Sequence, residues 1–244
     1  MLHAAHELLE TLQRLDGFYE CPKDPSGRRL GPLVGYAGRD AHGRQFVGDT
    51  YANFARIEGR PQDLYSFARE LAALLLGRDE VKNINVYCGA PEGGKTLAVL
   101  LTLLKLCRYI YPEKKILALA TGAERERSKL FWGRHEIYPG DRVVIVEDVM
   151  NNFSTTTELV QLIETSGGEV VAITGLLNRS LTIGDTFTPG SHTPIPVVAL
   201  LRKPIPEYTQ DDPAVAEDVA RGNVVWKPKT EWLRLMEAMN AHRK

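Results

Sequence analysis

Residues 143–158 read Val-Val-Ile-Val-Glu-Asp-Val-Met-Asn-Asn-Phe-Ser-Thr-Thr-Thr-Glu, and this stretch decides the fold class. Its apolar, β-branched start predicts a buried strand over Arg142–Glu147, with a second carboxylate directly after it at Asp148. The polar residues that follow predict a turn and then a helix over Thr155–Ser166. A strand, a polar turn and a helix in this order are typical of an α/β protein.

The start of this expected helix has the properties of an anion site. Thr155 and Glu158 have the spacing of a capping box, which fixes the first helical turn and leaves backbone N–H groups pointing outward. Those donors, the helix dipole and the neighbouring Asn, Ser and Thr side chains suit a phosphate monoester. The carboxylates of Glu147 and Asp148 suit sugar hydroxyls or Mg²⁺. A ribose 5-phosphate has both features, whereas the simpler interpretation is a strand that ends in solvated acids before a capped helix.

Strand-length apolar runs alternate with helical patterns on both sides of this stretch. The further strands that we expect are Ile84–Cys88, Ile116–Ala120, Val170–Leu177 and Pro194–Leu201, and the further helices are Leu64–Leu76 and Thr96–Tyr109. This alternation predicts an α/β fold with an open, mainly parallel sheet and flanking helices. In such sheets, ligands bind outside the carboxyl ends of the strands.

The pattern along the chain divides it into three segments. Residues 1–60 hold an amphipathic helix and a Gly- and Pro-rich stretch with a hairpin, Leu33–Tyr36 and Gln45–Val47, which we interpret as a small hood or flap. Residues 61–205 form the expected α/β core. Residues 206–244 form a C-terminal extension, ending in a short helix, that we expect to pack on the core.

The bulk composition excludes several classes of function. The 30 Lys and Arg residues nearly balance the 31 Asp and Glu residues, so bulk charge gives no argument for a nucleic-acid or membrane partner. The longest apolar run, Leu97–Leu106, is far shorter than the roughly 20 residues that cross a bilayer. Three cysteines outside any CxxC pair suit reduced thiols, and we therefore expect a cytoplasmic protein.

A glycine-rich loop lies between an expected strand and an expected helix. It reads Gly-Ala-Pro-Glu-Gly-Gly-Lys-Thr over Gly89–Thr96 and satisfies the nucleotide-binding pattern of Gly, four residues and Gly-Lys-Thr. With an acidic strand end that could hold Mg²⁺, it fits a P-loop ATPase or kinase. Lys95 is the residue that most favours this hypothesis.

The acidic stretch also resembles the signature of type I phosphoribosyltransferases, in which four apolar residues, two acids and two apolar residues precede a small Thr/Gly-rich phosphate loop. The resemblance implies that Glu147 and Asp148 contact the ribose hydroxyls of phosphoribosyl diphosphate (PRPP). It also implies that Asn151–Thr155 wrap the 5-phosphate. This chain departs from the family pattern at Asn151-Asn152-Phe153, where Phe153 replaces a glycine.

Three more motifs are similar to the orotate phosphoribosyltransferase branch of that family. Gly89, Gly94 and Ala98 match its diphosphate loop, and Asn178-Arg179-Ser180 resembles the Asp-Arg pair that holds the base. Basic residues stand near the family's mobile catalytic loop, namely Arg125, Arg127, Lys129, Arg134 and His135. Positive charge there would neutralise a departing diphosphate.

The resemblance implies a type I phosphoribosyltransferase-like core, a homodimer and transfer of phosphoribosyl from PRPP to a nitrogenous base, with orotate as the first choice. The implied catalytic residues are Lys129, His135 and Asp148, with Asp148 also meeting Mg²⁺ carried by PRPP, and the implied base contact is Arg179. The implied PRPP-binding residues are Gly89, Glu92, Gly93, Gly94, Lys95, Thr96, Glu147, Asp148, Asn151, Asn152, Ser154 and Thr155. Besides the P-loop hypothesis, a non-catalytic PRPP or nucleotide-binding protein is an alternative, because the Asn-Asn-Phe segment fits binding without turnover.

Overall fold

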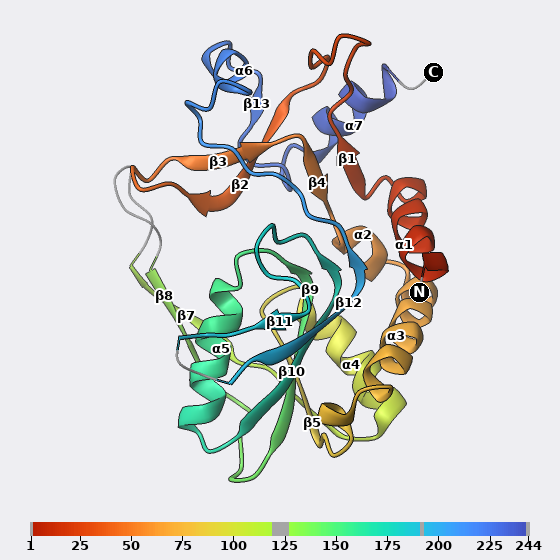
Figure 1. Cartoon of the computed structure of the whole chain (residues 1–244), viewed down its shortest axis with the longest axis vertical. Coiled ribbons are helices and arrows are strands. Elements are labelled where there is room, and N and C mark those ends of the chain that lie inside the picture. Colours follow the sequence, from red (N-terminus) through yellow and green to blue (C-terminus); the bar gives the residue numbers. More distant parts are fainter. Residues whose placement is uncertain (1, 119–126, 191–192, 243–244) are drawn as a thin grey trace. The chain divides into compact units, whose positions relative to one another are not determined.

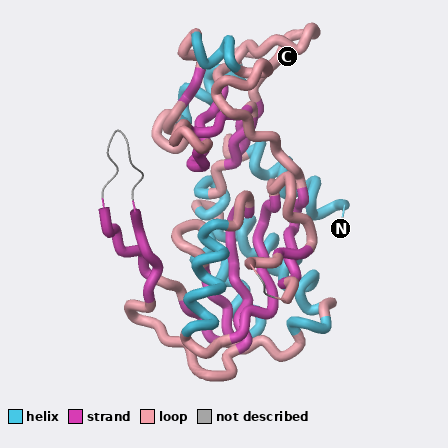
Figure 2. Tube along the Cα trace, turned by 60° about the vertical axis from the view of Figure 1, so that its left-hand side comes forward, coloured by secondary structure: helices cyan, strands magenta, loops and turns pink. Residues whose placement is uncertain are grey.

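The computed structural model describes residues 2–118, 127–190 and 193–242 (Figures 1 and 2). The chain forms two compact units, one of Met1–Leu8 and Ile57–Pro204 and the other of Leu9–Arg56 and Ile205–Lys244. Helix α1 (Leu2–Arg14) and the short α2 (Ala55–Glu58) lie at the points where the chain passes from one unit to the other. Among the described residues, none of the helices is both long and apolar enough to span a bilayer.

A six-stranded sheet is the centre of the first unit. Its order is β11-β12-β10-β9-β5-β6, and every neighbouring pair is parallel except β11 with β12. The strands are β5 (Val86–Gly89), β6 (Arg108–Ile110), β9 (Arg142–Met150), β10 (Glu169–Asn178), β11 (Thr186–Phe187) and β12 (Ile195–Arg202). The predicted open, mainly parallel sheet is confirmed.

Helices cover both faces of this sheet (Figure 1). Helices α3 (Pro61–Leu76) and α4 (Gly94–Lys105) lie on one face, and α5 (Ser154–Thr165) lies on the other. Each helix buries residues at helical spacing, and in α5 these include Leu159, Val160 and Ile163, which share a core with alternate residues of β9. Apolar burial on both faces explains the nearly continuous apolar sequence of the central strands.

Two of the sequence predictions near the edge of the sheet are wrong. The helix predicted over Thr96–Tyr109 ends at Lys105, because Leu106 adopts the left-handed conformation with φ 56°. The chain then forms the edge strand β6, beside β5. The segment predicted as a sheet strand at Ile116 instead belongs to β7 (Glu113–Ala118), which pairs antiparallel with β8 (Arg127–Phe131). Its charged first half suits a separate hairpin better than a doubly covered sheet.

Strand β9 extends three residues beyond its predicted end at Glu147. Val149 and Met150 still pair with Leu177 and Asn178 of β10, because β10 continues far enough to offer backbone partners. The two adjacent carboxylates therefore lie within the strand, near its carboxyl end, and not after it.

The second unit contains two small sheets and a C-terminal helix. Strands β2 (Leu33–Arg39) and β3 (Gln45–Gly48) form the predicted hairpin, and β13 (Val224–Val225) pairs parallel with β2. Strand β1 (Phe18–Glu20) pairs antiparallel with β4 (Thr50–Ala52). The remaining helices are α6 (Ala216–Ala220) and α7 (Trp232–Asn240).

The C-terminal helix of this unit packs against its N-terminal strands. Trp232 and Leu235 of α7 share a core with Tyr19 and Val34, and the Trp232 indole donates a 2.7 Å hydrogen bond to the Asp16 carbonyl. Segments from the two ends of the sequence thus bury one apolar cluster together. This packing is internal to the second unit.

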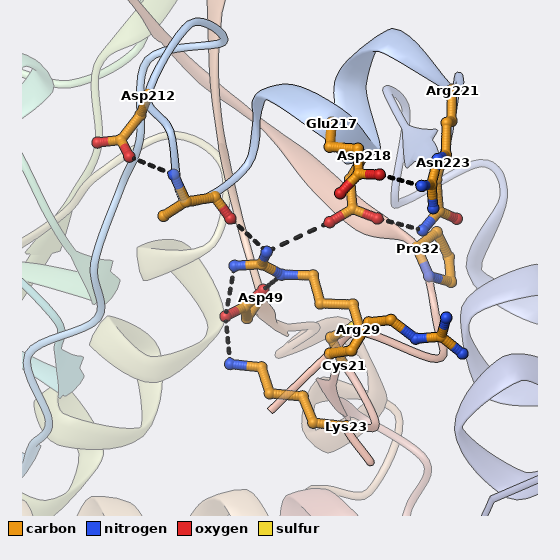
Figure 3. A network of polar contacts seen from close by, with 12 residues as sticks. Cys21, Lys23, Arg29, Pro32, Asp49, Asp212, Glu217, Asp218, Arg221 and Asn223 are labelled. Atoms are coloured by element: carbon orange, nitrogen blue, oxygen red, sulfur yellow. Dashed lines mark hydrogen bonds and ion pairs between the residues drawn. The ribbon is translucent and has the colours of Figure 1, made fainter. Parts of the chain in front are cut away.

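A network of ion pairs also joins the two ends of the second unit (Figure 3). Asp49 accepts hydrogen bonds from the guanidinium of Arg29 and, at 2.8 Å, from Lys23. Arg29 also reaches Asp218 at 3.3 Å and the Ala214 carbonyl. Burial raises the pKa of Asp49, but the hydrogen bonds from Arg29 and Lys23 outweigh it and hold that pKa below its usual value.

We predict that Asp49→Asn destabilises the protein at neutral pH by about 1–3 kcal/mol, because it removes one of the two carboxylates that pair with the mostly buried Arg29 guanidinium. Since the folded pKa of Asp49 is depressed, its contribution is present above the unfolded pKa of about 3.9 and is lost as pH falls through the lower folded pKa. Free energies of unfolding measured from pH 7 to pH 3 should therefore converge for wild type and variant. Glu217→Gln, in an exposed pair with Arg221, is the control and should have little effect. A constant gap at acid pH would contradict this account.

Candidate active site

The carboxyl ends of three adjacent strands bring the predicted site segments to one edge of the sheet. Strand β9 pairs in parallel with β5 on one side and with β10 on the other. The glycine loop follows β5, the turn at Asn151–Phe153 follows β9, and Arg179 follows β10. Parallel strands end at the same edge, so these three segments are neighbours.

The glycine loop packs directly on the end of β9. The Ala90 amide donates a 2.8 Å hydrogen bond to the Val146 carbonyl. A Cβ at Gly94 would lie 1.9 Å from that same carbonyl oxygen, and a Cβ at Gly93 would lie 2.2 Å from the Asp148 carboxylate. Because the Val146 carbonyl belongs to the strand backbone, position 94 requires glycine, whereas a Cβ at position 93 would displace the Asp148 side chain. The loop backbone therefore lies against Asp148.

The two carboxylates point to opposite faces of β9, as strand alternation requires. Glu147 lies on the α5 side, where Thr156 donates a 3.5 Å hydrogen bond to it, and only 9% of Glu147 is exposed. Burial and then the neighbouring charge of Asp148 raise the pKa of Glu147 well above its usual value. Asp148 is half-buried and lies beside Gly93. Of the two residues predicted to contact ribose, Asp148 is the one placed against the glycine loop.

The capping box predicted for Thr155 and Glu158 is wrong. Helix α5 begins one residue earlier, at Ser154, and its N-cap position is Phe153 without a side-chain capping bond. Instead, the Asn152 side-chain oxygen accepts hydrogen bonds from the Ser154 amide at 3.1 Å and the Ser154 hydroxyl at 3.0 Å. Asn152 closes the turn before the helix, which leaves Thr155 inside the first helical turn.

The first turn of α5 retains free backbone donors. The Thr157 amide bonds to the Phe153 carbonyl, and the Ser154 amide bonds to Asn152. Within the described ranges, no hydrogen-bond acceptor faces the Thr155 or Thr156 amides. Two unpaired N–H groups at the positive end of a helix are suited to an anion.

Phe153 adopts the backbone conformation for which the family pattern uses glycine. Its φ is 56°, in the left-handed region. The ring does not lie over the turn, because it is buried to 97% in the core and stacks on Phe187 with ring centroids 4.8 Å apart. The left-handed conformation costs about 1–2 kcal/mol in a non-glycine residue, and burial of the ring offsets that cost.

Lys95 and His135 both contact an aromatic residue that the sequence analysis did not single out, Tyr111. The Lys95 ammonium is 2.7 Å from the Glu92 carboxylate and 4.7 Å from the centre of the Tyr111 ring. The His135 ring lies edge-on to Tyr111 at 4.6 Å. Burial, and then the charge of Arg134, lower the pKa of His135. The signal for Tyr111 was its position immediately after an edge strand that the sequence analysis had merged into a helix.

The other predicted basic residues lie on or beside the β7–β8 hairpin. Lys129 is an exposed residue of β8, and Arg127 lies at the start of that strand. Arg134 pairs with Glu113 after the hairpin. Arg125 lies outside the described residues. The structure thus brings His135, but not Lys129, into contact with the residues around the glycine loop.

The residues of the Asn178-Arg179-Ser180 segment have different structural roles. The buried Asn178 side chain donates to the Ile183 and Gly184 carbonyls, both at 3.0 Å, and accepts from the Ser180 amide. Asn178 therefore stabilises the loop that follows β10. The Arg179 amide donates to the Met150 carbonyl at 2.9 Å, which fixes half-buried Arg179 next to the turn after β9.

The fold and this arrangement of loops define a class, the type I phosphoribosyltransferase fold. Orotate phosphoribosyltransferase from Aeropyrum pernix is similar with a TM-score of 0.53 and 19% identity, covering 80% of this chain and 93% of that one. UMP synthase from Leishmania donovani is similar with a TM-score of 0.52 and 20% identity, covering 80% of this chain and 36% of that one. At these identities the likeness concerns the fold.

The sequence relatives that match part of the chain are named orotate phosphoribosyltransferases. Orotate phosphoribosyltransferase from Caldanaerobacter subterraneus subsp. tengcongensis is 32% identical over 133 residues, which cover 54% of this chain and 62% of that protein. The Thermotoga maritima protein of the same name is 25% identical over 66% of this chain and 75% of its own length. The match thus spans less than two thirds of the first of these relatives. No protein-family model matches the chain.

We predict that glycine is better than alanine at position 153. Phe153→Ala should lower the free energy of unfolding by about 3–5 kcal/mol through loss of the buried ring. Phe153→Gly should lower it by about 1 kcal/mol less, because glycine has no Cβ to oppose φ 56°. Urea unfolding of both variants measures the difference. At Phe67, equally buried but in the right-handed helix α3, the order should reverse, and the same order at both sites would contradict the role of φ.

We also predict that Glu147→Gln stabilises the protein. Because the folded pKa of Glu147 is raised, ionisation destabilises the folded state as pH rises above the unfolded pKa of about 4.3. The variant should gain about 1 kcal/mol at pH 7.5 and very little at pH 4, where the wild-type acid is mostly protonated in both states. Thermal unfolding at both pH values tests this. Glu158→Gln, at an exposed position of α5, should be neutral at both, and a destabilised Glu147→Gln at pH 7.5 would contradict the prediction.

Proposed function

We propose that this protein transfers the 5-phosphoribosyl group of PRPP to a nitrogenous base and releases diphosphate. The observation that carries the proposal is the contact of the glycine loop with Asp148, together with the free amides at the start of α5 on the same edge of the sheet. A backbone-lined loop, a carboxylate and a helix start correspond in order to the diphosphate, the ribose and the 5-phosphate of PRPP. Catalysis of this kind would serve nucleotide biosynthesis.

In this proposal each loop binds one part of PRPP. The glycine loop Gly89–Thr96 holds the diphosphate with its backbone and with Lys95, and Asn151–Thr155 hold the 5-phosphate. Asp148 accepts hydrogen bonds from the ribose hydroxyls, joined by Glu147 if the strand end opens to the ligand. Such positioning lowers the barrier by aligning the reacting atoms before reaction.

The proposed reaction breaks the bond between ribose C1 and a diphosphate oxygen and forms a bond from C1 to a ring nitrogen of the base. Positive charge develops on the ribose ring, and the diphosphate takes the bonding electron pair. Lys95, with Lys129 and His135 closing from the hairpin side, would stabilise the departing negative charge. The negative charge of the Asp148 carboxylate would stabilise the transient positive charge on the ribose.

Mg²⁺ belongs to this proposal as an ion that arrives with PRPP. The described residues contain no group of three or more His, Cys, Asp or Glu side chains placed to bind a metal. The half-buried carboxylate of Asp148 suits a single contact to an ion that diphosphate oxygens already hold, since Mg²⁺ keeps oxygen ligands. Bound there, the ion would neutralise charge on the leaving diphosphate.

Orotate is the base that we propose first. The curated relatives are named orotate phosphoribosyltransferases, and Arg179 lies at the end of β10 where a carboxylate of the base could pair with it. A cytoplasmic homodimer that binds neither nucleic acid nor membrane completes the proposal.

The proposal is tested first by titration calorimetry with PRPP and, separately, with ATP, each with Mg²⁺. PRPP binding followed by diphosphate release on addition of orotate supports the transferase. PRPP binding without release with any base supports a non-catalytic binder. ATP binding that Lys95→Ala abolishes, without PRPP binding, would replace the proposal with a P-loop enzyme.

We predict that Asp148→Asn lowers kcat/KM for PRPP by about 100-fold, because the amide cannot supply the charge that stabilises the ribose in the transition state. Steady-state release of diphosphate measures the change. Glu158→Gln removes the same charge from an exposed position of α5 and should retain wild-type rates. Equal rates for wild type and Asp148→Asn would remove Asp148 from the mechanism.

A further inference from the structure

Lys95 has two partners that differ in how firmly they are held. It lies in the first turn of α4, and its side chain is 26% exposed. The Glu92 carboxylate, 2.7 Å from the ammonium, belongs to a side chain that is 80% exposed. The second partner is the Tyr111 ring, whose centre lies 4.7 Å from the same nitrogen.

The Tyr111 ring packs in a cluster with two other rings. His135 lies edge-on to it at 4.6 Å, and Tyr109 lies 5.7 Å away at 39°. Tyr109 is part of β6, the edge strand paired with β5, from which the glycine loop begins. A buttressed ring attracts a cation with little loss of entropy, because the ring is already in place.

The Glu92 contact is weaker and is replaceable. Exposed ion pairs contribute little, because water screens them and two flexible side chains must be ordered. Glu92 is also the only carboxylate that the described structure pairs with Lys95, and it lies in the loop that would bind diphosphate. A ligand with several negative charges competes for the ammonium with a large advantage.

We propose that Tyr111 is a positioning residue that holds Lys95 at the glycine loop, and that the Glu92 carboxylate occupies the ammonium until diphosphate oxygens displace it. The inference rests on the proposed function, because it concerns the diphosphate end of the same site. In this proposal the backbone of Glu92 contributes to diphosphate binding, whereas its carboxylate weakens that binding by competing for Lys95. The two neighbours of Lys95 therefore have opposite effects on diphosphate affinity.

The first test is calorimetric titration of inorganic diphosphate with Mg²⁺. Glu92→Gln should bind about two- to fivefold more tightly than wild type, the range of an exposed ion pair. The control is Asp79→Asn, which removes an equally exposed acid from an (i, i+3) pair with Lys82 before β5, at the opposite end of that strand. It changes the net charge equally but should leave affinity unchanged. Equal gains in both variants would reduce the effect to net charge and overturn the proposal.

The second test uses the aromatic ring. Tyr111→Leu should weaken diphosphate binding about three- to tenfold, and Tyr111→Phe should stay within about twofold of wild type, because phenylalanine keeps the ring face. KM for orotate should be unchanged in both. An equal loss of diphosphate affinity in Tyr111→Leu and Tyr111→Phe, or an equally large rise in KM for orotate, would indicate general damage to the site and overturn the positioning role.

The third test does not depend on ligand. Lysines carrying ¹³C-methyl groups give resolved NMR signals, and the Lys95 signal is assigned as the one that Lys95→Arg removes. That signal should show a ring-current shift in wild type and Tyr111→Phe. It should show no such shift in Tyr111→Leu. A Lys95 signal without that shift in wild type would overturn the proposal. If the shift and the diphosphate effects occur but no base releases diphosphate, the proposed function fails and the inference stands. If catalysis occurs without these effects, the inference alone fails.

Discussion

The close approach of the glycine loop to strand β9 is the constraint on which the site depends. Gly94 has no room for a Cβ beside the Val146 carbonyl, and a Cβ at Gly93 would displace the Asp148 carboxylate. Because β5 and β9 are adjacent and parallel, any larger residue at position 94 would push the loop away from the strand end. The contact therefore places backbone donors next to a carboxylate without using a flexible side chain. It also fixes the start of α4, and with it the position of Lys95.

The end of β9 and the turn after it contain two energetically unfavourable features, which the packing of the surrounding core stabilises. Phe153 is held at a positive φ, and Glu147 is buried beside a second acid. A neutral side chain at position 147 would remove the buried charge, whereas glycine at position 153 would relieve the positive φ only with the loss of the buried ring. The presence of both features at one strand end is expected of a site in which backbone direction and charge matter more than local stability. The stacking of Phe153 on Phe187 links this turn to β11, at the far edge of the sheet.

The sequence was sufficient for the sheet and for the order of its loops, because apolar periodicity and glycine spacing report local structure. It was insufficient where a long-range partner decides the outcome. Nothing local indicates that Leu106 is left-handed or that residues 113–118 pair with 127–131. The predicted capping box is absent because the helix begins at Ser154, whose amide donates to the Asn152 side chain. Tyr111 was missed because its role depends on Lys95 and His135, which are distant in sequence.

The strand order β9-β5-β6 places a negative group at one side of the site and a positive group at the other. Asp148 lies on the β9 side of the glycine loop, and the Lys95 ammonium lies over Tyr111, directly after β6. The loop backbone that follows β5 therefore separates a negative from a positive group. A substrate that becomes positive at its sugar and negative at its leaving group is stabilised in only one orientation across such a site. In a P-loop protein the lysine ammonium and the acidic strand both act on the same triphosphate, so the two charged groups are not divided between two parts of the ligand. The position of Lys95 on the β6 side thus favours a ligand divided between sugar and diphosphate over a nucleoside triphosphate.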